Sequence, residues 1–343
     1  MIISRTPLRI SFFGGGTDYP AWYLKEGGAV LSTTIDKYIY IPCRYVPPFF
    51  ETRHSIVWAK MENVLKIDEI EHPAIRTALR YLGFNDDFGV DIRYQGDIPS
   101  RSGMGSSSAF VVGLLNALKA LNGERMSKHQ LALTAIHLEQ NILNEAVGAQ
   151  DQVATAYGGL NFIEFLRGGE ICVQPVILPQ DRMHQLDDCL MLFYSGISRF
   201  SSEIAAQVVA NIPTKSDSLN RMRNLVDDAT KVLSGDHSLD DFGALLHDTW
   251  VLKRGLSNRV SNDTIDGIYE RARKAGALGG KLLGAGESGF MLFYVPQDRR
   301  EAVLHTLKDL LHVPFKLSPQ GSSIIHYDPE TADWRSGKGH ASA

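Results

Sequence analysis

The sequence predicts an α+β protein with two cores. Residues 9–13 and 29–46 carry the β-branched and aromatic side chains that are typical of paired strands. The composition changes after Asp181, where helical patterns begin to follow one another. A chain of 343 residues is more often two domains than one. We therefore divide it into domains of residues 1–184 and 185–343.

Proline, glycine and serine mark several element boundaries. Pro73 stands in the first turn of a helix that Gly83 ends, and Ser127 is a suitable N-cap for another. Strands are predicted, in chain order, at residues 9–13, 29–46, 55–59, 90–94, 158–166, 171–178, 189–194, 290–295 and 322–327. Helices are predicted at residues 73–82, 106–121, 128–146, 202–210, 219–233, 239–256, 264–274 and 299–311.

Charge and composition exclude several classes of protein. Lys and Arg total 35 against 39 Asp and Glu, so no basic excess points to nucleic acid or an anionic membrane. No segment approaches the roughly 18–20 uninterrupted apolar residues of a membrane span, and the first residues lack the pattern of a secretory leader. The three cysteines lie far apart, without the spacing of a zinc site. We expect a cytoplasmic protein with reduced thiols.

One stretch combines glycines, hydroxyls and a helix start. Residues 98–109, here called the Gly/Ser loop, read Ile-Pro-Ser-Arg-Ser-Gly-Met-Gly-Ser-Ser-Ser-Ala and lead into the apolar helix predicted at 106–121. A helix start offers unpartnered N–H groups and partial positive charge to an anion, and glycines let the anion come close. It is not a Walker A loop, since no lysine follows the second glycine. The pattern indicates a triphosphate site, with a plain serine N-cap as the alternative.

Two further glycine clusters end in polar residues. The first glycine loop is Gly14-Gly15-Gly16-Thr17-Asp18, which follows a predicted strand. The third is residues 284–289, which match GxGxxG but precede a strand instead of opening a helix, so the dinucleotide interpretation fails. Each cluster alone is more simply a chain turn, and Asp18 could be a turn residue or a polyol ligand.

Two carboxylates follow the Gly/Ser loop. Glu139 lies in the predicted helix 128–146, where a carboxylate facing a phosphate loop could hold Mg²⁺. Asp151 comes after Gly148, where that helix should have ended, and a carboxylate in that loop could take a proton from a hydroxyl. A solvated face or a helix cap is the alternative for each.

The three glycine segments together resemble the GHMP kinase superfamily, whose members include galactokinase and the homoserine, mevalonate and phosphomevalonate kinases. The matching segments are residues 6–19, 99–109 and 281–289, in the family's order, and the resemblance extends over about residues 2–330. It implies an N-terminal domain with a βαβ-type nucleotide site and a C-terminal ferredoxin-like domain. The active site would lie in the cleft between them.

The resemblance also implies roles by matched position. It makes Asp151 the catalytic aspartate, with Arg9 beside it, and makes Glu139 and Ser107 (or its neighbour Ser106) the Mg²⁺ ligands. Glu139 precedes Asp151 by 12 positions, as in the galactokinase branch. The ATP-binding residues would be Pro99, Gly103, Met104, Gly105, Ser106, Ser107 and Ser108. The substrate-binding residues would be Gly15, Gly16, Thr17, Asp18, Ser195, Arg199, Gly284 and Gly286.

One departure concerns the acceptor sugar. Galactokinases have Glu-His where this chain has Gly15-Gly16, and the form seen here is similar to the heptose-phosphate kinase and fucokinase branch. That branch implies transfer from MgATP to the anomeric oxygen of D-glycero-D-manno-heptose 7-phosphate. Candidate cations for the distal phosphate are Lys37, Arg44, Arg53 and Arg199. The alternatives are a kinase of unphosphorylated fucose or galactose and a non-catalytic sensor, and the sequence leaves monomer and homodimer equally open.

Overall fold

The computed structural model describes the chain except residues 48, 101, 197–201, 288 and 330–343. Its larger sheet has ten strands, centred on the pair β1 (Ile2–Phe13) and β2 (Gly28–Val46), and runs β14-β1-β2-β5-β3-β4. The long strand β2 also pairs with β6, β7 and β13. The other strands of this sheet are β3 (His54–Val57), β4 (Met61–Val64), β5 (Gly89–Arg93), β6 (Gln95–Gly96), β7 (Asn161–Phe165), β8 (Ile171–Pro175), β13 (Leu317–Ser318) and β14 (Ser323–Tyr327).

The second sheet confirms the ferredoxin-like expectation. Its four strands are β9 (Leu190–Tyr194), β10 (Gly279–Leu282), β11 (Phe290–Tyr294) and β12 (Leu311–His312). They are antiparallel in the order β10-β11-β9-β12, with helices between β9 and β10 and again between β11 and β12. This is the β-α-β-β-α-β arrangement of ferredoxin-like domains.

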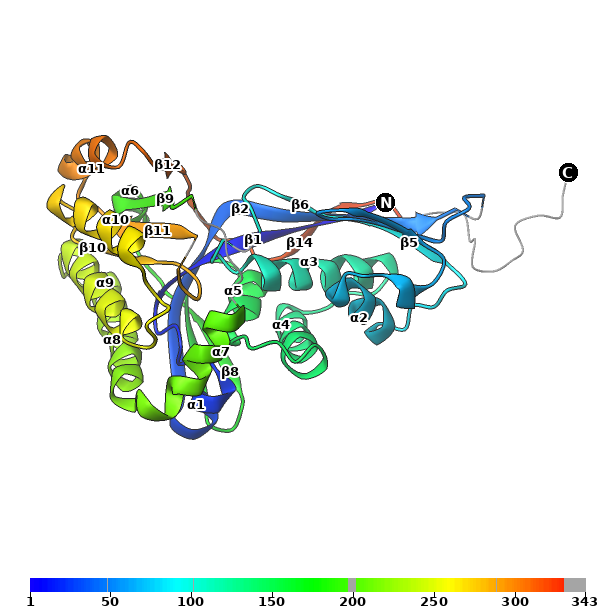
Figure 1. The fold of residues 1–343 in the computed structure, drawn as a ribbon, viewed down its shortest axis with the longest axis horizontal. Coiled ribbons are helices and arrows are strands. Elements are labelled where there is room, and N and C mark those ends of the chain that lie inside the picture. Colours follow the sequence, from blue (N-terminus) through cyan, green and yellow to red (C-terminus); the bar gives the residue numbers. More distant parts are fainter. Residues whose placement is uncertain (48, 101, 197–201, 288, 330–343) are drawn as a thin grey trace, which may run out of the picture.

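Helices cover one face of the larger sheet and surround the smaller one (Figure 1). The central helix is α3 (Ser106–Leu121), which lies along β1 and β2 as its apolar sequence predicts. Helices of the first part of the chain are α1 (Pro20–Glu26), α2 (Pro73–Tyr81), α4 (Lys128–Ile136), α5 (Gln150–Tyr157) and α6 (Gln180–Cys189). The later helices are α7 (Ser202–Asn211), α8 (Ser216–Ser234), α9 (Leu239–Arg254), α10 (Asp263–Lys274) and α11 (Arg300–Thr306).

The two sheets share one continuous hydrophobic core. Phe242 of α9 packs edge-on against Phe12 and Phe13 of β1, with ring centroids 5.2 and 5.0 Å apart. Strands β13 and β14 then return to pair with β2 and β1, which places residues 317–327 beside the first part of the chain. The division at residues 184 and 185 stays a prediction, and it falls within α6.

Three predicted elements differ from the structure. The helix predicted at 128–146 ends early: α4 gives way to a π-helical turn, His137–Ile142, and Asn144 has a φ of 53° that no helix can continue. Asp151 was predicted in a loop but lies in the first turn of α5. The last predicted helix, 299–311, is shortened to α11, because residues 307–310 form a turn and Leu311 begins β12.

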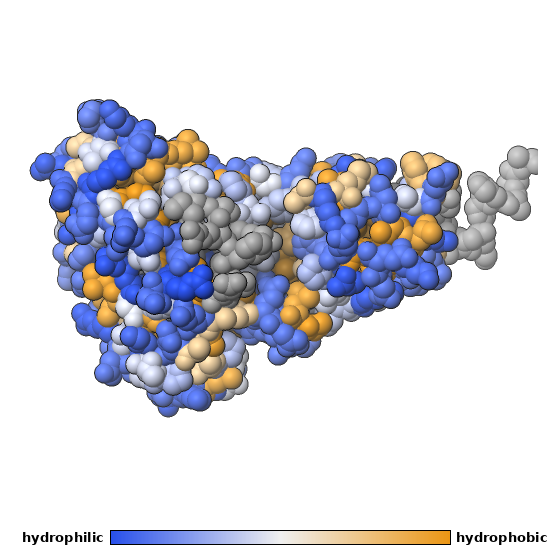
Figure 2. Space-filling view, in the orientation of Figure 1, coloured by the Kyte–Doolittle hydropathy of each residue, from blue (hydrophilic) through white to orange (hydrophobic). Residues whose placement is uncertain are grey.

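Figure 2 shows a largely hydrophilic face on which hydrophobic side chains form small separate groups. None of the described helices combines the length and apolar character needed to span a bilayer.

Truncating Phe242 should destabilise the protein, because this side chain packs between the two sheets. Its side chain is fully buried against both Phe12 and Phe13, so Phe242→Ala should lower the free energy of unfolding by ~3–5 kcal/mol. Urea denaturation measures this. Phe49→Ala, at a side chain that is 74% exposed, is the control and should stay within about 0.5 kcal/mol of the wild type. Equal losses in the two variants would contradict the packing argument.

Candidate active site

The predicted residues meet around one cavity of about 740 Å³ between the two sheets. The first glycine loop, the Gly/Ser loop, α5 and the third glycine loop all contribute to its wall. The predicted residues that line it are Arg9, Gly15, Gly16, Asp18, Gly103, Gly105, Ser106, Ser107, Ser108, Asp151 and Gly284. The sequence pattern thus located the cavity from segments far apart in the chain.

The Gly/Ser loop delivers the start of α3 to this cavity. Gly105 is the N-cap residue, with a left-handed φ of 71°, and no side chain caps the helix. The serine N-cap offered as the alternative is therefore wrong. A Cβ on Gly105 would stand 3.1 Å from Arg9 Cγ and 3.2 Å from Asp151 Oδ2. Only glycine combines this conformation with that closeness, and the first N–H groups of α3 stay available to an anion.

Arg9 and Asp151 form a bidentate ion pair. Arg9 Nε donates to Asp151 Oδ1 and Arg9 Nη2 to Oδ2, each at 2.7 Å. The third guanidinium nitrogen, Nη1, donates to the carbonyl of Gly103 at 2.8 Å. The arginine is 4% exposed, whereas the aspartate side chain retains 22% exposure toward the cavity. The pair therefore fixes a carboxylate at the cavity wall and binds β1 to the Gly/Ser loop.

Glu139 lies behind the start of α3. It is fully buried, accepts a hydrogen bond from Ser108 Oγ at 3.2 Å and a second from Gln152 Nε2. Burial raises the pKa of Glu139 to about 8, opposed by these two hydrogen bonds. Ser107, the predicted partner of Glu139 at Mg²⁺, is instead exposed on the cavity wall. The serine that contacts Glu139 is its neighbour Ser108.

These residues suit Mg²⁺ chemically. The ion prefers oxygen ligands and is usually held by one or two carboxylates together with substrate phosphates. Glu139 and the hydroxyls of residues 106–108 supply such a set, and Gln152 Oε1 beside Glu139 is buried without a hydrogen-bond partner among the described residues. Binding of Mg²⁺ by these oxygen atoms stays a prediction.

The third glycine loop packs backbone against backbone on the Gly/Ser loop. A Cβ on Gly103 would stand 2.3 Å from the carbonyl oxygen of Leu283, and one on Gly284 would stand 2.3 Å from Gly103 Cα. Gly289 likewise has no room beside the carbonyl of Ser102. These glycines serve close approach between the two parts of the chain, and Gly284 also reaches the cavity.

Two lysines at the cavity, one half-buried and one buried, carried no predicted role. Lys253 of α9 donates to the carbonyls of Leu282 (2.8 Å) and Gly284 (2.5 Å), and burial lowers its pKa to about 7, helped by the charge of Arg9. Lys281 of β10 donates to the carbonyls of Ser11 and Phe12, and burial holds its pKa well below the usual value. Lys253 lies in an ordinary amphipathic helix, so no local pattern distinguishes it.

Asp18 joins the first glycine loop to α5. Its carboxylate accepts the N–H groups of Gly16 (2.9 Å) and Gln150 (3.3 Å). Burial raises its pKa to about 6, although the bond from Gly16 opposes this shift. A carboxylate at this wall, next to Asp151, suits a hydroxyl-bearing ligand.

The other predicted site residues contact the protein itself, lie away from the cavity or fall outside the described residues. Met104 is buried, and its carbonyl accepts the N–H of Arg9. The Thr17 hydroxyl is bonded to the carbonyls of Gly14 and Ala29, and Ser195 Oγ accepts the N–H of Gly289. Pro99 is exposed outside the cavity wall, Gly286 packs on Val260, and Arg199 lies outside the described residues.

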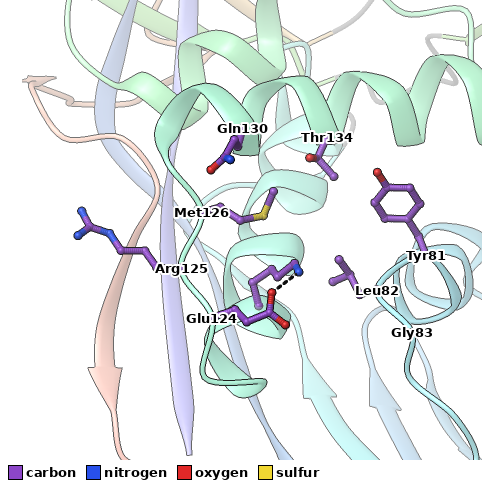
Figure 3. A pocket seen from close by; sticks show the side chains of 9 residues that line it. Tyr81, Leu82, Gly83, Glu124, Arg125, Met126, Gln130 and Thr134 are labelled. Atoms are coloured by element: carbon purple, nitrogen blue, oxygen red, sulfur yellow. Dashed lines mark hydrogen bonds and ion pairs between the residues drawn. The ribbon is translucent and has the colours of Figure 1, made fainter.

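A second cavity, of about 580 Å³, lies away from these motifs (Figure 3). Side chains from the end of α2, the segment after α3 and the start of α4 surround it, and Lys119 pairs with Glu124 at 2.6 Å. It includes none of the residues predicted for the site.

Comparison with known proteins fits this geometry. Residues 70–159 match the N-terminal domain of GHMP kinases, and residues 228–312 match the GHMP kinase C-terminal domain. The chain belongs to the GHMP kinase superfamily. It is accordingly an ATP-dependent phosphotransferase that uses an alcohol group as acceptor.

Some of the named relatives are sugar or sugar-phosphate kinases, and others are mevalonate kinases. The chain is 29% identical over 321 residues to a D-glycero-alpha-D-manno-heptose 7-phosphate kinase of Campylobacter jejuni, covering 90% of this chain and 93% of that one. It is 27% identical to an L-fucokinase/L-fucose-1-P guanylyltransferase of Bacteroides fragilis, of which it spans only 35%. A crystal structure of a D-glycero-D-manno-heptose 1-phosphate kinase from Bacteroides thetaiotaomicron superposes with a TM-score of 0.78, at 23% identity, over 95% of this chain and 99% of that one.

Adding one methyl group at Gly284 should damage the site. Its φ is +80° and the new Cβ would meet the backbone of Gly103, so Gly284→Ala should push the two loops apart and weaken ATP binding ~10-fold or more. Isothermal titration with a non-hydrolysable ATP analogue measures this. Gly267→Ala is the control, because a Cβ there meets no atom within 4 Å. Normal nucleotide affinity in Gly284→Ala would show that the contact does not shape the site.

Proposed function

We propose that this protein phosphorylates a sugar phosphate, and that Asp151 is the base of the reaction. The observation that carries the proposal is the bidentate Arg9–Asp151 pair at the same cavity wall as the start of α3. The start of α3 suits phosphates, and the adjoining part of the cavity wall carries the fixed carboxylate of Asp151. Phosphoryl transfer depends mainly on such alignment and charge placement.

The nucleotide would bind through the chain's own backbone. Its phosphates would lie against the Gly/Ser loop, where the first turn of α3 presents N–H groups and Ser107 presents an exposed hydroxyl. Mg²⁺, held by Glu139 and Ser107 or Ser108, would neutralise phosphate charge. Lys253 would position the third glycine loop, because it holds the carbonyls on both sides of Leu283.

The acceptor hydroxyl would lie beside Asp151. Each carboxylate oxygen has lone pairs beyond those that Arg9 uses, so Asp151 can orient the hydroxyl and take its proton as the oxygen attacks. Arg9 keeps the carboxylate in place and offsets the negative charge that develops. Asp18 would accept a second hydroxyl of the sugar.

The acceptor we favour is D-glycero-D-manno-heptose 7-phosphate, at its anomeric oxygen, which gives the 1,7-bisphosphate. Support comes from Gly15 and Gly16 in place of a carboxylate and an imidazole, and from the heptose-phosphate kinase relative that aligns with nearly the whole chain.

One observation favours an unphosphorylated sugar instead. The described cations at the cavity wall are Arg9, Lys253 and Lys281, and protein oxygens already hold all three. Of the cations predicted for a distal phosphate, Lys37, Arg44 and Arg53 bind protein oxygens elsewhere. Arg199 lies outside the described residues. A fucokinase-like or galactokinase-like activity is therefore the second candidate.

An ADP-release assay over matched sugars and sugar phosphates should separate the two. We expect the heptose 7-phosphate to be turned over faster than the unphosphorylated heptose, fucose and galactose. Asp151→Asn should lower kcat by ~10²-fold or more while ATP still binds, because the base is lost and the phosphate site is not. Faster turnover of an unphosphorylated sugar would contradict the choice of acceptor. An Asp151→Asn variant with wild-type activity would contradict the assignment of Asp151 as the base.

Acceptor use should depend on the ionisation of Asp18. With the Asp18 pKa raised to about 6, the carboxylate is progressively protonated as the pH falls below 7, and a protonated group no longer offers the same acceptor to the sugar. The kcat/KM for the acceptor should fall about tenfold between its plateau and pH 5. Asp18→Asn should have a low kcat/KM that varies little over this window. If the variant keeps the wild-type slope, another group is responsible.

A further inference from the structure

Two unsatisfied polar atoms stand at the wall of the active-site cavity. Buried polar atoms in folded proteins are nearly always hydrogen bonded. Ser11 Oγ and Gln150 Oε1 are buried and have no hydrogen-bond partner among the described residues, yet both residues line the cavity. Ser11 as a whole is only 7% exposed. Because Ser11 and Gln150 also line the cavity, a ligand bound there is a candidate partner.

The two side chains converge on the same small space. A Cβ on Gly15 would stand 3.5 Å from Ser11 Oγ and 3.6 Å from Gln150 Nε2. Glycine at position 15 thus leaves open a space that any other side chain would enter. Gln150 is next to Asp151 in the first turn of α5, and its N–H donates to Asp18. The space therefore adjoins the two carboxylates that the proposed reaction assigns to the acceptor.

The atoms in this space suit a hydroxyl group. The Gln150 amide atom that borders this space is Nε2, which donates, and a serine hydroxyl can donate or accept. A hydroxyl group in this space can accept from Gln150 Nε2 and donate to Ser11 Oγ. Lys281 fixes the backbone here through the carbonyl of Ser11, so Ser11 is held in place before any ligand arrives.

Resting on the proposed function, we infer that Ser11 and Gln150 form a specificity subsite for a further hydroxyl of the acceptor, and that Gly15 provides the room for it. A substrate with this hydroxyl bonds to Ser11 Oγ and Gln150 Nε2. An analogue without it leaves Ser11 Oγ buried and unpaired, which is the arrangement by which enzymes reject deoxy analogues most strongly.

Steady-state kinetics with the acceptor that the wild type prefers test this subsite. Ser11→Ala and Gln150→Leu should each raise the KM for the acceptor about three- to tenfold, with kcat and the KM for ATP within about twofold of the wild type. A merely structural role would disturb ATP use as well.

Ser32→Ala is a matched control. Ser32 pairs with Ser11 across β1 and β2, is equally buried, and its Oγ also lacks a partner among the described residues, but it does not line the cavity. Its acceptor KM should equal that of the wild type.

Monodeoxy acceptors make the test specific. One of them should be a poorer substrate for the wild type, and Ser11→Ala should have lost most of that discrimination. If Ser11→Ala and Gln150→Leu keep the wild-type acceptor KM while the wild type is active, the subsite is disproved and the proposed function stands. If the wild type releases no ADP with any sugar or sugar phosphate, the proposed function fails and the subsite falls with it.

Discussion

The geometry of the site depends on a contact between the backbones of two loops. Gly103 and Gly284 lie so close that a single methyl group on either would overlap the backbone of the other loop. Gly103 is also held to β1 through its carbonyl and Arg9, whose own N–H bonds the carbonyl of Met104. The three glycine segments therefore share one fixed point, and the geometry of Arg9, Asp151 and the start of α3 follows from it.

Charge at the cavity is balanced by the protein before any ligand binds. Arg9 is paired with Asp151, and carbonyl oxygens hold Lys253 and Lys281. Burial raises the pKa values of Asp18 and Glu139 and lowers that of Lys253, and each shift favours the neutral form of the group. A phosphate group would favour the charged form of Lys253, and a divalent cation that of Glu139. The polar groups of the cavity wall are held in position before a ligand binds, and their charges nearly cancel. The charges of a bound ligand would add to this arrangement.

Part of this arrangement was predictable. Local sequence predicted the start of α3 at the Gly/Ser loop, whereas Arg9 beside Asp151 was expected only from the resemblance, because Arg9 lies within β1 and Asp151 was expected in a loop. The ferredoxin-like order also followed from the resemblance. Ser108 in contact with Glu139 was not predictable, since the choice among three consecutive serines is set by the π-helical turn that carries Glu139. Lys253 and Gln150 were missed because their roles arise only from packing between distant elements.

The return of β14 to the edge of β1 has a consequence for how the chain acquires its structure. Ile2 pairs with Tyr327, so the outermost strand of the first sheet comes from a segment far along the chain from β1. Until it arrives, β1 has one row of backbone N–H and C=O groups without a neighbour, which is the kind of edge that recruits strands from other molecules. Pairings of such sequence separation also form slowly. Folding of this chain thus includes an interval in which that edge of β1 is exposed, and the interval ends when β14 pairs with it.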